Sequence, residues 1–339
     1  MQAKAADLLL SPLDGLRRRV LVALGPIGLP LVRDRELRVA AAGALTVLFA
    51  LALTGLAPLW SMALGPVILG APHLVADVRY LVVKPGLHRR RLLAVGAGIP
   101  LLCAAANLGV QAGLVACAMV LLIAEATPKK RIAGLLAVAA LAWGAALAES
   151  SAELIFAHLH NFLAVGFFWM WRPRSRRLHA VPLVLFALAS AAIGFGALDA
   201  AWIAASRFAP AGLDAADRLA TLAPDLTGAA GGRLVLLFAF AQSVHYAVWL
   251  RLLPDEARPQ KTPRTFAASA RALRADFGAV GLAACAAVAV GIAGWAAFDL
   301  ANAYDGYLRL AVFHGHLELA AIALIFCEGR AALAPRESR

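Results

Sequence analysis

The chain has 339 residues, of which 62% are hydrophobic and 15% are charged, and its formal net charge is +12. Soluble globular domains contain roughly 45–50% apolar and about 25% charged residues, so this composition excludes an ordinary soluble protein. The basic excess does not indicate nucleic-acid binding, because the arginines lie in short loops between apolar runs, as in the cytoplasmic loops of membrane proteins. The sequence therefore predicts an integral membrane protein surrounded by lipid, with no nucleic-acid partner.

Residues 1–38 precede the first long apolar run and form the first predicted segment. The stretch MQAKAADLLLSPLDGLRRRV lacks a long apolar core and a small-residue cleavage site, so we do not expect a cleaved signal peptide. Leucine-rich patches beside Arg17, Arg18 and Arg19 are typical of a helix that lies in the membrane interface. A solvated cytoplasmic tail is the alternative interpretation.

Apolar runs of membrane-spanning length fill residues 39–328. A spanning helix needs about 20 mostly apolar residues. Ten runs approach that length, near 39–58, 60–83, 92–108, 111–126, 132–149, 150–171, 180–203, 232–252, 277–298 and 308–327. The sequence thus predicts an all-α, polytopic transmembrane helical bundle of about ten spans, followed by a cytoplasmic tail at 329–339.

The placement of positive charge predicts the orientation of this bundle. If the N-terminus is cytoplasmic, the basic loops VKPGLHRRR, TPKKR, RPRSRR and RLLPDEARPQKTPR all lie on the cytoplasmic side, as the positive-inside rule requires. We therefore expect both termini in the cytoplasm and the bundle in the cytoplasmic (inner) membrane. The longest outer loop, near 207–231, suits either a short amphipathic helix over the outer end or a plain connector.

Six of the eight histidines lie inside predicted spans. They are His73, His158, His160, His245, His314 and His316. His88 and His179 lie among arginines in loops, and we expect them to be solvated. At 1.5 Å per residue, the intramembrane histidines of four spans lie near one level, with His245 somewhat closer to the cytoplasm. Intramembrane ionisable groups are costly and usually mark a functional site in the bundle interior, so this common level predicts a shared site.

Each histidine-bearing span also has a second polar group on its histidine face. The partners are Asp77 for His73, Glu149 and Glu153 for His160, Gln242 for His245, and Glu318 for His314. Side chains three, four or seven residues apart share one face of a helix. Imidazole ligands with nearby carboxylates are what a metal site needs. We predict a metal centre with histidine ligands, in which Asp77, Glu153 and Glu318 are further ligands or catalytic carboxylates.

Two of the spans carry a pair of histidines two residues apart. Such residues point about 200° apart on an ideal helix, so both members of a pair cannot reach one centre without distortion. We favour His160 and His314 as ligands because each shares a face with a glutamate, and we keep His158 and His316 as alternates. A local bulge at Gly315 would bring His316 in as well.

The ligand types limit the metal and the chemistry. Imidazole and carboxylate suit non-haem iron, with copper or zinc as alternatives. Iron or copper suits dioxygen chemistry on a lipid-soluble substrate, which a site in the hydrocarbon layer meets, whereas zinc suits hydrolysis. A proton-coupled transporter, a bis-histidine haem electron-transfer protein and purely structural histidines are the alternatives. Tyr246 and Trp249, beside His245, either line a substrate cavity or pack against neighbouring helices.

Three segments resemble a known family of membrane enzymes. GAPHLVADVRYLV is similar to the G-x-P-H-G-x-x-D type of motif of the Brp/Blh family, whose members cleave β-carotene to retinal. Gly70, Pro72, His73 and Asp77 match that motif, and Leu74 stands where the family has glycine. FAQSVHYAVWLR and FHGHLELAAIAL resemble the later histidine-bearing helices of the family in order and approximate spacing. The resemblance implies a histidine-coordinated iron dioxygenase that acts on a carotenoid or a similar apolar molecule.

Overall fold

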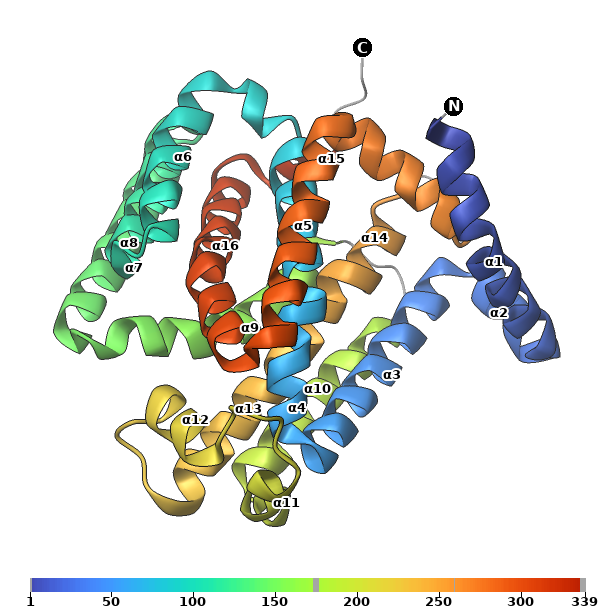
Figure 1. The fold of residues 1–339 in the computed structure, drawn as a ribbon. Helices are drawn as coiled ribbons and strands as arrows, with labels where there is room; N and C mark the ends of the chain where they lie inside the picture. Colours follow the sequence, from blue (N-terminus) through green and yellow to red (C-terminus); the bar gives the residue numbers. More distant parts are fainter. Residues whose placement is uncertain (1, 173–176, 259, 336–339) are drawn as a thin grey trace.

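The computed structural model describes residues 2–172, 177–258 and 260–335, with side chains described from residue 8 onward (Figure 1). The chain is 86% helical, and the described residues contain no strand. Within these described ranges, eight helical segments are long and apolar enough to cross a membrane. The protein is therefore an all-α, multi-pass membrane protein, as its composition predicts.

The long apolar segments occur where the sequence predicts spans. They are α3 (Arg35–Leu56), the continuous α4–η2 segment (Pro58–Val83), α8 (Pro128–Ala148), α9 (Ser151–Trp171), η4 (Arg177–His179) with α10 (Ala180–Gly194), the continuous α13–α14 segment (Gly228–Glu256), α15 (Phe266–Phe298) and α16 (Leu300–Glu328). The runs expected near 92–108 and 111–126 form α6 (Arg91–Ala105) and α7 (Gly109–Ile123), which have only 15 residues each. These two helices are shorter than the usual spanning range of about 17–25 residues.

The N-terminal segment is helical and docks on the bundle. It forms α1 (Gln2–Ala23) and α2 (Gly25–Arg33), and α1 lies along the first part of α15. Asp14 caps α15, because its Oδ1 accepts a hydrogen bond from the backbone N–H of Phe266 at 2.7 Å. Arg17 donates to the backbone oxygen of Arg264. These contacts favour a fixed helix over the solvated tail.

The long loop predicted near 207–231 is also structured. It contains the end of η5 (Ala205–Phe208) and α12 (Ala215–Leu222), whereas α11 (Asp199–Ala204) lies at the end of the run expected near 180–203. Leu222 packs with Met62 and Phe238 in a buried apolar cluster. Arg218 pairs with Asp305 of α16 at 3.1 Å. The alternative of a short helix is therefore correct for this loop. Leu222 and Arg218 hold α12 against the bundle.

Three segments form the centre of the bundle. α13 (Gly228–Ala247), α16 and the α4–η2 segment have the most buried residues, whereas α8 and α15 expose most of theirs. α13 packs against α3, α9 and α10, and α16 packs against α6, α7 and α15. In Figure 1, α16 and α5 lie between α6–α8 on one side and α3 on the other. Exposed apolar side chains on the outer helices, such as Leu136 and Val280, are typical of lipid-facing surfaces.

The central segments depart from regular α-helix at three places. α5 (Ala71–Asp77) lies between two π-helical segments, η1 (Gly65–Gly70) and η2 (Val78–Val83), and η6 (Val248–Leu252) continues α13 before α14 (Leu253–Glu256). A π-turn changes the direction in which the following side chains point, and such turns are frequent at functional sites. η1 and η2 flank the helix that carries His73, and η6 follows the helix that carries His245.

Ionic contacts tie the basic segments to neighbouring helix ends at one end of the bundle. Arg90 binds Glu328 at the end of α16, with N–O distances of 2.6 and 2.7 Å. Arg38 binds Asp255 of α14 in the same way, with two bonds of 2.8 Å. The start of α1 and the end of α16 lie at the same, upper end in Figure 1.

Candidate metal centre

Four imidazoles from four helices meet in the interior of the bundle. α5 supplies His73, α9 supplies His160, α13 supplies His245 and α16 supplies His314. The ring centroids of His73 and His314 are 4.7 Å apart, and those of His160 and His314 are 5.0 Å apart. His245 lies 5.2 Å from His73 and 5.4 Å from each of the other two rings. The structure thus brings together one histidine from each of the four predicted helices.

His73, His245 and His314 have the spacing to hold one metal ion. One ring nitrogen of each lies within 4.8 Å of the corresponding nitrogens of the other two, and all three residues are buried. Imidazole nitrogens bind an ion such as zinc at about 2.0–2.1 Å, so two ligands of one ion are at most about twice that distance apart. The observed limit of 4.8 Å between the nitrogens is slightly wider than this distance, and small side-chain rotations are enough to bring the nitrogens closer.

Three of the histidines direct Nδ1 at a carbonyl oxygen of their own helix. The pairs are His73 with Gly70 at 2.7 Å, His160 with Ala157 at 2.8 Å, and His314 with Ala311. A carbonyl oxygen only accepts hydrogen bonds, so in a neutral ring Nδ1 carries the hydrogen and donates it. Nε2 is left with its lone pair, which is the form in which imidazole binds a metal.

His245 is oriented by a side chain of a neighbouring helix. Its Nδ1 donates to Oδ1 of Asn161 of α9 at 2.9 Å. The amide itself is fixed, because Asn161 Nδ2 donates to the backbone oxygen of Ala157 at 3.1 Å and leaves Oδ1 as the acceptor. Sequence reasoning missed this role, since the contact joins two helices. The only local signal is that Asn161 follows His160 in a predicted span.

The metal-facing nitrogens of the three clustered histidines lack hydrogen bonds. Nε2 of His73, of His245 and of His314 is buried, and the described residues offer none of the three a hydrogen-bond partner. A buried polar atom without a partner costs about 1–3 kcal/mol. One cation held between the three imidazoles would relieve all three atoms together.

Two buried carboxylates adjoin the imidazoles. Oδ2 of Asp77 lies 3.8 Å from Nε2 of His73, and Oε1 of Glu318 lies 3.2 Å from Nε2 of His245. Trp249 donates its indole N–H to Oε1 of Glu318 at 2.8 Å, whereas neither oxygen of Asp77 has a hydrogen-bond partner among the described residues. Buried carboxylates without a counter-charge are strongly unfavourable. Their presence beside bare imidazole nitrogens therefore suits a metal cation.

The ion-pair contact of Glu318 differs from the predicted one. Helix spacing pairs Glu318 with His314 of its own helix, whereas in the structure it contacts His245 of α13. The reason is the packing of α16 on its neighbours: a side chain four residues from a histidine shares its face but reaches whatever the next helix presents there.

Three predicted site residues lie outside the cluster. Nε2 of His158 faces the backbone oxygen of Leu222 in α12 at 2.8 Å. The ring of His316 stacks on Phe156 with a centroid distance of 4.2 Å. Glu153 is exposed in the first turn of α9, close to the turn that joins α8 to α9, so the predicted glutamate stripe does not reach the centre.

No bulge forms at Gly315. α16 continues as a regular α-helix through this residue, so His316 points away from His314, as a spacing of two residues requires. Gly113 of α7 makes room for the displaced ring, because a Cβ atom there would lie 2.0 Å from Nδ1 of His316. The histidine therefore fills a packing position between α16 and α7.

The two loop histidines differ from each other. His88 is exposed, as expected. His179 is only 3% exposed, so the expectation of a solvated side chain is wrong for it. Its backbone oxygen accepts a hydrogen bond from the indole N–H of Trp169 at 2.8 Å. This contact holds the segment before α10 against α9, and it buries a residue that the charged loop sequence places in water.

Two buried tyrosines border the cluster beside His73. The ring of Tyr246 lies 4.4 Å from the ring of His73. The hydroxyl oxygen of Tyr307 lies 3.2 Å from Nδ1 of His73 and accepts a hydrogen bond from Tyr246 at 3.4 Å. Gly70 permits this approach, because a Cβ atom there would lie 2.4 Å from Cζ of Tyr307. Tyr307 is a second contributor that sequence reasoning missed.

The buried site combines three clustered imidazoles, a fourth imidazole beside them and two carboxylates, all within the helical bundle. Ligands of this type suit iron, copper or zinc. Comparison of the chain with protein-family models, with curated proteins and with solved structures finds no match.

Proposed function

We propose that the chain is an integral-membrane metal enzyme that holds non-haem iron between His73, His245 and His314 and uses dioxygen to oxidise a lipid-soluble substrate. The observation that carries the proposal is a set of three buried imidazoles from three helices, with one ring nitrogen of each within 4.8 Å of the others. Nε2 of each of these imidazoles has no hydrogen-bond partner among the described residues. Copper and zinc are the alternatives by ligand type.

Each residue of the centre has a role in this proposal. His160 is a fourth ligand, and Asp77 and Glu318 balance the charge of the ion or complete its coordination. The acceptors at Nδ1 fix the imidazoles in the metal-binding tautomer and raise their basicity. When bound, the iron supplies dioxygen activation. Tyr246 and Tyr307 exclude water on the His73 side, because both are fully buried against the ring.

An apolar substrate is proposed from the setting of the centre. The ligands lie on helices with the composition of membrane spans, so a substrate dissolved in the bilayer meets them more readily than a solute from water does. The resemblance of GAPHLVADVRYLV to the Brp/Blh family points in the same direction. We therefore propose a carotenoid or another polyene as the substrate class.

The alternatives are less well supported by the geometry. A bis-histidine haem needs two imidazoles on opposite faces of a porphyrin, whereas these rings approach one another with centroids 4.7–5.4 Å apart. A proton-coupled carrier needs polar groups along a path through both leaflets. In this chain the histidines and carboxylates of the centre form one compact cluster and not a path.

The topology of the proposed enzyme includes ten spans with both termini cytoplasmic. α6 and α7 would be the two short crossings. Support for the orientation comes from the basic loops, two of which are tied to neighbouring helix ends by the pairs of Arg38 with Asp255 and of Arg90 with Glu328. The positive-inside rule places that end in the cytoplasm.

Metal analysis of the purified protein tests the proposal. The full chain is purified in detergent without added metal, and its iron, copper and zinc contents are measured by mass spectrometry. We expect about one equivalent of iron per chain, because a site with this many donors retains its ion through purification. Consumption of dioxygen with a carotenoid in mixed micelles then tests the reaction. A folded chain that neither contains nor takes up a transition metal would contradict the enzyme.

A further inference from the structure

A cavity separate from the histidine centre lies at the end of the bundle that carries Arg251, Arg258 and Arg264. It has a volume of about 560 Å³ and opens between α1, the α5–η2 segment, the η6–α14 segment and α15. Ligand pockets in proteins have volumes of about 300–1,000 Å³. Pro72 and Trp249 form the wall toward the centre, and none of the proposed metal ligands lines the cavity.

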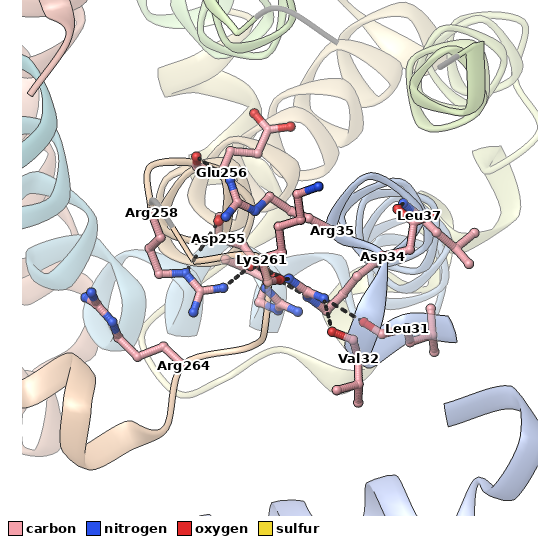
Figure 2. Close-up of polar contacts among 12 residues, drawn as sticks. Leu31, Val32, Asp34, Arg35, Leu37, Asp255, Glu256, Arg258, Lys261 and Arg264 are labelled. Carbon is pink, nitrogen blue, oxygen red and sulfur yellow. Dashed lines mark hydrogen bonds and ion pairs between the residues drawn. The ribbon is translucent and has the colours of Figure 1, made fainter. Parts of the chain in front are cut away.

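One end of this cavity is strongly basic. Its charged lining residues are Arg17, Arg79, Arg251, Arg258 and Arg264, with Asp255 as the single carboxylate. Asp255 is shared, because Arg38, Arg251 and Arg258 all bind it. Figure 2 shows Arg258 directed at Asp255, whereas the side chain of Arg264 extends away from that carboxylate. Arg79 is paired with Asp276 of α15 at 2.6 Å, but Arg17, Arg251, Arg258 and Arg264 still leave positive charge in surplus at this end.

The surplus is reflected in two arginines outside the membrane-spanning helices. Burial lowers the pKa of Arg17, and the charge of the neighbouring Arg251 lowers it further. Burial also lowers the pKa of Arg264, with added effects of Arg258 and Arg79. A guanidinium held among like charges in a partly buried site is stabilised when an anion binds beside it.

The other end of the cavity is apolar. Val75 and Ala76 of α5 line one side, and Leu282, Ala286 and Ala289 of α15 line the other. α15 exposes most of its residues along its length, which places this end beside the lipid-facing surface. The two ends belong to one continuous cavity, which is charged near the loops and apolar between α5 and α15.

We propose that this cavity binds an amphiphile that has one apolar chain and an anionic head group, either carboxylate or phosphate. The head group lies among Arg17, Arg258 and Arg264, and the chain lies between Val75 and Ala286. Guanidinium groups bind both kinds of anion through paired, charge-assisted hydrogen bonds. The inference goes beyond the proposed oxidation and does not depend on it, because the site shares no side chain with the metal ligands.

Binding of four probes to the full chain in neutral detergent tests the proposal. The probes are oleate, oleoyl lysophosphatidate, oleyl alcohol and inorganic phosphate. We expect at least one of the two anionic amphiphiles to bind more than about tenfold tighter than the alcohol and the phosphate, which is about 1.4 kcal/mol. The tighter of the two identifies the head group. Binding of the alcohol or of phosphate alone as tightly as the amphiphiles, or binding of neither amphiphile, would overturn the proposal.

A matched pair of variants locates the head group. Arg264→Gln removes a guanidinium from the cavity, and we expect it to weaken binding of the amphiphile about tenfold. Arg19→Gln removes the same charge from an exposed position outside the cavity and should leave binding unchanged. Equal affinity in the two variants would refute the assigned position, whereas thermal unfolding of both variants verifies that each is folded.

Two native cysteines locate the apolar chain. Cys285 lines the cavity, and Cys103 on α6 does not, yet both are half-buried free thiols. We expect bound amphiphile to slow alkylation of Cys285 by N-ethylmaleimide and to leave Cys103 unaffected, as measured by mass spectrometry of the two peptides. Unchanged alkylation of Cys285 at saturating ligand would show that the apolar chain of the amphiphile binds elsewhere. That result would not bear on the proposed metal centre.

Discussion

The molecule contains two buried polar clusters that differ in how their groups are satisfied. Around Asp255, both carboxylate oxygens bind guanidinium groups: Arg38 binds both, Arg251 binds Oδ2 and Arg258 binds Oδ1. Figure 2 shows Arg258 directed at Asp255. Around the imidazoles, neither oxygen of Asp77 has a hydrogen-bond partner in the described part of the chain. The Asp255 carboxylate is fully bound within the protein, whereas the Asp77 carboxylate lacks a partner there.

This difference separates a carboxylate that joins helices from a carboxylate at the proposed metal site. Arg38 joins α3 to α14 and also donates to the backbone oxygens of Leu31 and Lys261, so its charge is matched by acceptors of the chain itself. Unmatched buried groups cost free energy, and a bound ligand can recover it. We therefore expect changes in the Asp255 cluster to alter stability, and changes in the imidazole cluster to alter metal binding.

The largest expected effect is the loss of metal from ligand variants. Replacing His73, His245 or His314 by alanine should weaken metal binding by more than about 100-fold, since loss of even an outer hydrogen-bond partner costs 10–100-fold. Metal content of the purified variants measures this. His88→Ala, at an exposed position, is the control and should keep the wild-type content. Equal metal content in all four variants would remove the three histidines from the site.

The next effect is on stability and comes from the other cluster. Asp255→Ala leaves the buried guanidinium groups of Arg38 and Arg258 without their carboxylate, and loss of one partner of a buried ion pair costs about 3–5 kcal/mol. Denaturant unfolding in detergent measures the loss. Asp199→Ala breaks the far more exposed pair with Arg233 and should have a much smaller effect. A metal content per folded chain that falls with Asp255→Ala would contradict the separation of the two clusters.

Metal removal provides the third test. Chelation should lower the melting temperature, and iron(II) restored at about 100 times its dissociation constant should return about 2.7 kcal/mol of stability. Differential scanning fluorimetry measures both shifts. Asp255→Ala should still gain stability from iron, whereas His314→Ala should not. The comparison fails if iron stabilises both variants equally.

A smaller effect is expected from the residue that orients His245. Asn161→Ala removes the acceptor of the Nδ1 hydrogen, and loss of such a partner typically weakens metal binding 10–100-fold. Competition with a chelator measures the affinity. Asn161→Asp keeps an acceptor oxygen and should retain more affinity than alanine does. Ser190→Ala, which removes a side-chain bond within α10, is the control. An affinity unchanged in Asn161→Ala would mean that packing alone orients the ring.

The smallest effects should come from the histidines outside the cluster. His158→Ala loses its contact with α12, and His316→Ala loses its stacking on Phe156. We expect both variants to keep the wild-type metal content, with stability lowered by about 1 kcal/mol, as is usual for single substitutions. Loss of metal from His316→Ala would return that residue to the ligand set.

Much of the fold is predictable from local sequence. Length and hydropathy locate all eight long apolar segments and the two short ones, because a membrane-spanning helix satisfies its backbone within a single segment. Helix periodicity also orders the site in part. It pairs His73 with Asp77, and it separates His314 from His316, since both relations lie within one regular helix.

Other features depend on contacts between helices. Glu318 shares a face with His314 but meets His245, and Asn161 of α9 orients the same histidine. Glu153 belongs to the face of His160, yet the turn before α9 leaves it exposed. Periodicity fixes the direction of a side chain about its own helix axis. It does not fix which neighbouring helix lies in that direction or how far a segment projects from the bundle.

The sequence by itself therefore determined that this chain forms apolar helices of membrane-spanning length and that four of these segments carry histidine. Tertiary structure alone decided which histidines meet, which carboxylates accompany them and where an arginine-lined cavity forms beside them. The physical reason is the range of the forces involved. Hydrophobicity and backbone hydrogen bonding act within one segment, whereas the crossing of packed helices sets every contact between segments.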